Sequence, residues 1–151
     1  VQFLPAFAED AGVSQYVGEF YNDAASLGAA ATVTVAAGET VANIDAGLAV
    51  GGAINGVVSG QEGGLAGVFV VAFGADGQAA AFDFSEASGA YRLSGLAAGS
   101  YTVEFITDAA PVAATRAYGS AFYDTTPPAE PTPVAVAAGQ AVSGIDQTLG
   151  R

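Results

Sequence analysis

The chain has 151 residues, of which 52% are hydrophobic and 21 are glycine, and its formal net charge is −12. This apolar content suffices for a buried core, so we expect a folded protein rather than a disordered one. With three Arg and no Lys to neutralise phosphates, the composition argues against nucleic-acid and anionic-membrane partners. The absence of Cys and His excludes disulfides and the Ser/His and Cys/His catalytic schemes.

The predicted elements are short strands. The best helical candidate, Ala8–Phe20, is weak because it carries two Gly. After it, apolar runs alternate with Gly, Asp-Gly, Ser-Gly or Pro clusters, which is typical of an all-β sandwich or barrel. The expected strands are Ala53–Val58, Val68–Phe73, Ala79–Phe84, Ala90–Leu93, Tyr101–Ile106, Arg116–Tyr123, Pro133–Ala137 and Val142–Leu149.

The stretch "YRLSGLAAGSYTVEF" (Tyr91–Phe105) contains two alternating apolar strings around a bend. Gly95 and Gly99 can adopt positive φ there without steric cost, so we expect them to reverse the chain. Leu96 is then an apolar side chain in the connection, and we expect it to plug the end of the core. Tyr101 is expected to act like a tyrosine corner, with its hydroxyl bonded to a nearby backbone group.

The sequence repeats itself with a period of about 102 residues. "VQF" at Val1 matches "VEF" at Val103, and "YVGEFYND" at Tyr16 matches "YGSAFYD" at Tyr118. After a one-residue slip, "VTVAAGETVANIDAGL" from Val33 matches "VAVAAGQAVSGIDQTL" from Val134. Apolar residues and turn glycines recur together, which indicates a structural repeat. We therefore interpret residues 1–50 as the second half of one unit and residues 51–151 as a complete unit.

Four segments resemble the carboxypeptidase regulatory-like domain, a relative of transthyretin-like sandwiches and of the B-type repeats of bacterial surface adhesins. They are "GAINGVV" (Gly52–Val58), "LAGVFVVAF" (Leu65–Phe73), "SGAYRLSGLAAGSYTVEF" (Ser88–Phe105) and "GIDQTL" (Gly144–Leu149). The resemblance implies a Greek-key β-sandwich, here in tandem, in an extracellular or cell-surface protein. Adhesin repeats often carry a Lys–Asn isopeptide crosslink, which this chain cannot form because it has no Lys.

Acidic residues near predicted turns are candidate calcium ligands, because Ca²⁺ prefers hard oxygen ligands at loop ends. Asp76 lies in "GADGQ", and Asp83 and Glu86 lie in "FDFSE". Further oxygen donors in the repeated "FYND" and "FYD" segments are Asn22, Asp23 and Asp124. The alternative interpretation is that these residues only shape turns, since Asp-Gly is a good hairpin turn and the spacing is not that of an EF-hand. We expect no other cofactor.

Repeated aromatic residues suggest a second kind of site. They could stack on sugars or pack into the core, and they are Tyr16, Phe20, Tyr21, Tyr118, Phe122 and Tyr123. Recurrence at equivalent positions favours core packing. Asp45 and Asp146 share the motif "ID-x-x-L", and we expect both to bond loop backbone rather than a ligand.

The sequence favours a structural module over an enzyme, because only scattered carboxylates remain to do chemistry. The primary hypothesis is a repeat of a secreted or cell-surface bacterial fibre, stalk or adhesin that assembles with copies of itself or with adjacent repeats. The alternative is a carbohydrate-binding or Ca²⁺-dependent binding module. No signal peptide is expected, and the longest uncharged run, Ala46–Gln61, is too short and too rich in Gly to span a bilayer.

Overall fold

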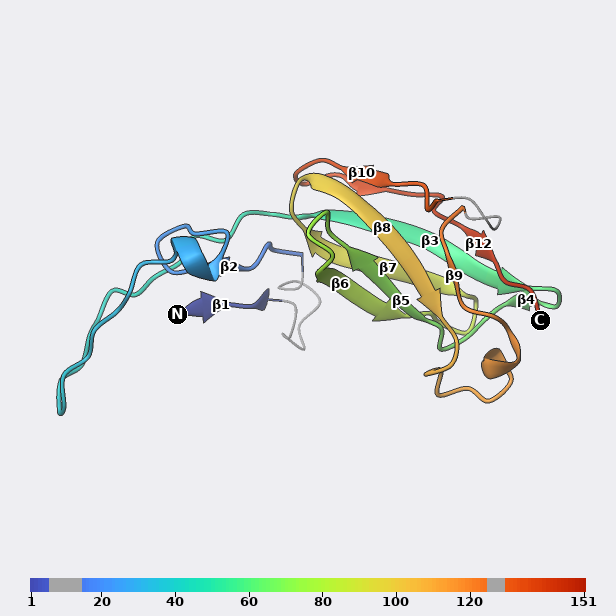
Figure 1. Ribbon diagram of the computed structural model, residues 1–151, viewed down its shortest axis with the longest axis horizontal. Coiled ribbons are helices and arrows are strands. Elements are labelled where there is room, and N and C mark those ends of the chain that lie inside the picture. Colours follow the sequence, from blue (N-terminus) through green and yellow to red (C-terminus); the bar gives the residue numbers. More distant parts are fainter. Residues whose placement is uncertain (6–14, 125–129) are drawn as a thin grey trace.

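The structure is a computed structural model that describes residues 1–5, 15–124 and 130–151. Residues 52–149 form two facing β-sheets, and residues 1–50 lie beside one end of this sandwich (Figure 1). The helical elements that lie wholly within the described residues are the 3-10 turns Leu27–Ala29 and Thr115–Ala117. This architecture confirms the predicted all-β sandwich.

The first sheet is built around β3 (Gly52–Gly60), the longest strand. It pairs antiparallel with β4 (Gly63–Gly64) and β7 (Ala90–Leu96), and parallel with β11 (Ala141–Val142) and β12 (Gln147–Thr148). The parallel pairs place the last strands of the chain beside the first strand of the sandwich, so β3 organises the whole sheet.

The second sheet has the strand order β10-β8-β5-β6, with β9 also paired to β8. Its strands are β5 (Phe69–Phe73), β6 (Ala79–Phe84), β8 (Gly99–Ile106), β9 (Ala121–Phe122) and β10 (Val134–Val136). All of these pairs are antiparallel. β5 is rich in β-branched and aromatic residues, which favour a pleated strand packed on both faces.

The core lies between the two sheets and follows the strand period of two. Ile54, Leu93 and Leu96 from the first sheet meet Val103 and Phe105 from the second, and all five are at most 1% exposed. Burying each side chain of this size contributes about 1.5–3 kcal/mol. The burial of Leu96 confirms that it closes the core, although it is the last residue of β7 rather than a loop residue.

Three buried hydroxyl groups are all bonded to backbone. Ser85 Oγ donates to the Leu65 carbonyl over 2.6 Å, Thr107 Oγ1 to the Tyr118 carbonyl over 2.6 Å, and Thr115 Oγ1 to the Ala66 carbonyl over 2.7 Å. Because a buried polar group without a partner costs about 1–3 kcal/mol, these bonds make the loops around the core compatible with burial. The Thr107 and Thr115 bonds anchor the long connection between β8 and β9.

Most predicted strands are present, and three parts of the prediction are wrong. Arg116–Tyr123 forms only β9, because the 3-10 turn Thr115–Ala117 occupies its start. Val142–Leu149 is split into β11 and β12 by a turn at Gly144, where φ is +80°. Gly95 has positive φ as expected, +72°, but Gly99 instead begins β8.

The first fifty residues contain little regular structure. β1 (Gln2–Phe3) pairs with β2 (Glu19–Phe20), so the end of the helical candidate Ala8–Phe20 is a strand. Its residues 8–14 lie outside the described residues. Residues 31–49 contain no strand and run out and back, away from the sandwich (Figure 1).

Candidate functional site

The segment that closes the sandwich is the C-terminal arm, which we define as residues 134–149. It pairs first with β8, where Val134 lies opposite Tyr101, and then with β3, where Thr148 lies opposite Ser59. Four of its large apolar side chains are 2–7% exposed, namely Val134, Val136, Ile145 and Leu149, and Val142 packs against the core while partly exposed. The arm therefore links both sheets and fills the core between them.

Several bonds beyond the strand ladder fix the C-terminal arm on β3. The Val57 amide donates to Asp146 Oδ1 over 2.8 Å, and the Leu149 amide donates to the Ser59 carbonyl over 2.8 Å. The bond to Asp146 confirms that this carboxylate binds backbone. Asp45, its counterpart in the first fifty residues, is exposed.

Tyr91 and Tyr101 hold the arm and the β7–β8 connection through their hydroxyls. Tyr91 donates to the Ile145 carbonyl over 2.6 Å, and Tyr101 donates to the Ala97 carbonyl over 2.7 Å. Burial, followed by the charge of Asp146, raises the pKa of Tyr91 far above its ordinary value. Burial, followed by the charge of Asp76, raises the pKa of Tyr101. Both side chains are therefore neutral donors, and the predicted role of Tyr101 is confirmed.

The N-terminal arm, which we define as residues 33–48, forms the same turns as the C-terminal arm. The Glu39 amide donates to the Ala36 carbonyl over 3.1 Å, as the Gln140 amide does to the Ala137 carbonyl. Gly38 and Gly139, the matched turn glycines, have φ of +80° and +68°. Asn43 likewise has φ of +61° where the C-terminal arm has a glycine at +80°. The local conformation is therefore encoded twice.

The N-terminal arm differs in that it contains no strand. Val35 and Val41, which correspond to Val136 and Val142, are 58% and 41% exposed. Ile44 and Leu48 are partly exposed, whereas their counterparts in the C-terminal arm are buried. An apolar strand sequence without a pairing partner is an interaction surface.

The two copies also share the register of another strand pair, which is β1–β2 in the first copy and β8–β9 in the second. Gln2 lies opposite Phe20 in β1–β2, as Glu104 lies opposite Phe122 in β8–β9. The Tyr21 amide donates to the Val1 carbonyl over 2.9 Å, and the Tyr123 amide to the Val103 carbonyl over 2.8 Å. By register, β1 therefore corresponds to the last part of β8.

The candidate calcium ligands bond to nearby backbone. Asp76 Oδ1 accepts from the Gln78 amide over 3.0 Å, and the two oxygens of Asp83 accept from the Phe84 and Arg92 amides, each over 2.8 Å. The backbone of Glu86 is part of the turn between β6 and β7. Among the described residues, no group of three acidic side chains is placed to hold a metal ion. The calcium site stays a prediction.

The remaining oxygen donors of the repeated "FYND" and "FYD" segments occupy strained turn positions. Asn22, Asp23 and Asp124 have φ of +70°, +54° and +52°, values that Asn and Asp tolerate better than most residues. Asp124 Oδ2 accepts from the Thr132 hydroxyl over 3.0 Å. These residues shape the turns that follow β2 and β9.

The repeated aromatic residues of the second copy contribute to the core. Tyr118 is 4% exposed, and Tyr123 packs against the core while partly exposed. Arg151 lies over the Tyr118 ring at 5.1 Å from the guanidinium carbon to the ring centroid. Tyr16, Phe20 and Tyr21 of the first copy are partly exposed. Core packing, the favoured interpretation, thus applies to Tyr118 and Tyr123.

An exposed aromatic surface lies elsewhere, on the outer face of β5 and β6. Phe82 and Phe84 are 49% and 48% exposed, and their rings lie 5.6 Å and 4.9 Å from the Phe69 ring, centroid to centroid. The alternation in "FDF" predicts that Phe82 and Phe84 share one face of a strand, and the structure shows that this face lies outside. Glu104 of β8 lies opposite Val71 of β5. Burial raises the pKa of the Glu104 carboxyl group.

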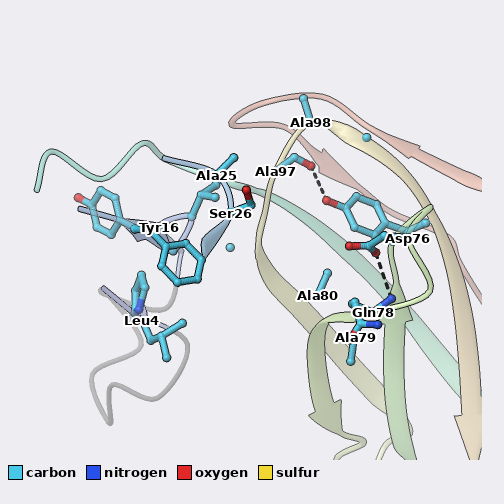
Figure 2. A pocket seen from close by; sticks show the side chains of 18 of the residues that line it. Leu4, Tyr16, Ala25, Ser26, Asp76, Gln78, Ala79, Ala80, Ala97 and Ala98 are labelled. Carbon is cyan, nitrogen blue, oxygen red and sulfur yellow. Dashed lines mark hydrogen bonds between the residues drawn. The ribbon is translucent and has the colours of Figure 1, made fainter. Parts of the chain in front are cut away.

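A cleft of about 1040 Å³ lies between the first fifty residues and one end of the sandwich (Figure 2). Leu4, Tyr16 and Ser26 line one side, and Asp76 and Ala97 line the other. Among the described residues that line the cleft, Asp76 is the only one with a carboxylate, and this group accepts a hydrogen bond from a backbone amide.

Comparison with known proteins identifies one family. The family model of the SdrD B-like domain matches residues 53–147. This match covers more than half of the chain and nearly all of the two-sheet sandwich. No curated protein matches the chain. Within the described residues, no helix is long and apolar enough to cross a membrane.

Proposed function

Because the chain belongs to the SdrD B-like domain family of adhesin-repeat β-sandwiches, we propose that it is a structural repeat that transmits mechanical load along a cell-surface protein. The family is a structural one found in surface proteins of the adhesin type. The composition supports this role, since the chain has neither His nor Cys for catalysis. The proposed setting is extracellular, in a fibre, stalk or adhesin.

One observation supports load transmission above all others, namely the parallel pairing of the first and last strands of the sandwich. Gln147 and Thr148 of β12 lie opposite Val58 and Ser59 of β3. The chain therefore enters at the Gly52 end of β3 and leaves at the opposite end, about 23 Å away at 3.3 Å per residue. Figure 1 shows the C-terminus at the far end of the sandwich from the start of β3.

This geometry places the bonds between β3 and the C-terminal arm in shear. Force applied at the two ends of the unit acts along the strands and across the hydrogen bonds, so these bonds share the load. They include the bonds from Val57 to Asp146 and from Leu149 to Ser59, and a 3.2 Å contact between the Ser59 and Thr148 hydroxyls. The sandwich should therefore resist extension better than a ladder that opens one bond at a time.

Single-molecule force spectroscopy tests this proposal. The chain has no Cys, so introduced cysteines provide unique attachment points. A Val50→Cys/Arg151→Cys variant loads the ladder in shear. A matched Glu62→Cys/Arg151→Cys variant unzips it, because Glu62 and Arg151 lie 3.6 Å apart, oxygen to nitrogen, at the same end of β3. We expect the shear pair to break at the higher force. Equal or lower force would contradict the proposal.

A second candidate function, glycan binding, is supported by the exposed pair Phe82 and Phe84. Aromatic side chains on a flat sheet face offer apolar surface to a sugar ring. A glycan array would test this, with a Phe82→Ala/Phe84→Ala variant as the control. Binding by the intact chain that the variant loses would support this function, and an empty array would reject it.

A further inference from the structure

The N-terminal arm has every feature of the C-terminal arm except its partners. Both arms carry the same apolar pattern and the same turns, and β1–β2 has the register of β8–β9. The C-terminal arm pairs with β8 and β3 of the sandwich. The N-terminal arm should therefore fit a pair of strands like β3 and β8, in the register that the C-terminal arm displays.

The chain's own β3 cannot serve the N-terminal arm. In the register of the C-terminal arm, Leu48 would lie beside Ser59, about 23 Å along the strand from Gly52. The connection from Leu48 to Gly52 reaches at most about 14 Å when fully extended. The edge of β3 is, moreover, already occupied by β11 and β12.

A second copy of this chain cannot satisfy all arms either. Each chain carries two arms, but it has only one β3 and one β8 with which an arm can pair. Exchange of arms between identical chains displaces one C-terminal arm for every N-terminal arm that it pairs. The number of unpaired arms is therefore the same before and after identical copies associate.

We propose that residues 1–50 receive the first half of another B-type repeat, a segment with the pattern of residues 52–102 whose last strand is continuous with β1. This inference rests on the proposed repeat function, since it names the partner through which one repeat meets the next. Residues 33–35 then pair with the part of that last strand that precedes β1, as Val134–Val136 pair with Gly99–Tyr101. Residues 40–48 pair with its β3-like strand.

The structure also specifies which β3-like strand fits. A Cβ at Gly52 would overlap Val136, and a Cβ at Gly56 would overlap the carbonyl oxygen of Ile145. The corresponding positions of the arm are Val35 and Ile44. The partner strand therefore needs two glycines four residues apart, as in "GAING", so that the arm can approach its backbone closely.

A fusion that places a copy of residues 51–102 directly before Val1 of the full chain tests the proposal. Thr102 then joins Val1, which is the counterpart of Val103. The readout is amide hydrogen exchange of residues 33–48, measured by mass spectrometry. We expect exchange in this segment to slow by about 100-fold or more relative to the unfused chain, because its amides enter a cooperative unit.

Two variants in the added copy serve as controls. Gly56→Val should abolish the new protection of the N-terminal arm and leave that of the C-terminal arm unchanged. Val57→Thr, at a position that is 40% exposed, should preserve the new protection. Rapid exchange of residues 33–48 in the fusion, or protection that survives Gly56→Val, would overturn the proposal.

The unfused chain provides a further test of the partner. Protection of residues 33–48 that rises with concentration would show that identical copies pair, and would also overturn the proposal. These exchange results concern only the N-terminal arm. The force measurement concerns only residues 50–151, so failure of one proposal is distinguishable from failure of the other.

Discussion

The two arms of this molecule have nearly the same sequence pattern and different structures. Both form a turn closed by a glycine with positive φ, Gly38 in one and Gly139 in the other. Only the C-terminal arm forms strands, and only there are the apolar side chains buried. The turn depends on residues within four positions of each other, whereas the strands depend on β3 and β8. The comparison separates what the local sequence specifies from what pairing adds.

The largest expected effect concerns the close approach of β3 to the C-terminal arm. Gly56→Val should destabilise the sandwich by more than about 4 kcal/mol, because the new side chain would overlap the Ile145 carbonyl. The same change at a glycine of the N-terminal arm, Gly47→Val, would place its Cβ where no atom lies within 4 Å, and it should change stability by less than about 0.5 kcal/mol. Urea unfolding measures both. Similar losses would show that the arms are equally packed.

Leu→Ala substitutions at matched positions of the two arms compare how much the leucine of each arm contributes to stability. Leu149→Ala should cost about 2–5 kcal/mol, because this side chain is 2% exposed in the core. Leu48→Ala, at the matched position, should cost less than about 1 kcal/mol, because Leu48 is partly exposed. Chemical denaturation followed by tyrosine fluorescence is suitable. A large loss for Leu48→Ala would mean that the N-terminal arm is packed without an external partner.

The shared "ID-x-x-L" motif allows a polar version of this test. Asp146→Ala should cost about 1 kcal/mol, since it leaves the Val57 amide without its acceptor. Asp45→Ala should change stability by less than about 0.5 kcal/mol, because Asp45 is exposed. Thermal unfolding of both variants at one pH provides the measurement. Equal effects would contradict the assigned role of Asp146.

The smallest expected effect is a pH dependence at Glu104, whose counterpart in the first fifty residues is the neutral Gln2. Burial raises the pKa of Glu104 above its ordinary value of 4.5, so the folded state holds this proton to a higher pH than the unfolded state. Stability should therefore fall as the pH rises from 4.5 through the folded pKa. Glu104→Gln should reduce this slope in unfolding titrations. An unchanged slope would assign the dependence to other groups.

Much of the sandwich was predictable from sequence because its strands carry strong local patterns. The predicted range Ala79–Phe84 coincides with β6, and the bend at Gly95 and the burial of Leu96 follow from the alternation around them. The hydroxyl bond of Tyr101 was predictable because its acceptor lies four residues away. Each of these features depends on neighbours close in the chain.

The parts that could not be predicted depend on distant partners. The split between β11 and β12 is set by where the arm meets β3 in parallel, about ninety residues away in sequence. The start of Arg116–Tyr123 is a 3-10 turn whose Thr115 hydroxyl is bonded to the Ala66 carbonyl, 49 residues away. The alternation in "FDF" places Phe82 and Phe84 on one face of a strand, but the exposure of that face depends on how the two sheets pack.

The N-terminal arm has no pairing partner among the described residues of this chain, whereas the C-terminal arm pairs with β3 and β8. Amide hydrogen exchange of the intact chain at low protein concentration, compared between residues 33–48 and 134–149, tests it most directly. We predict near-random-coil exchange in the N-terminal arm and strong protection in the C-terminal arm, where the ladders to β3 and β8 hold the amides. Equal protection of the two arms would contradict the account.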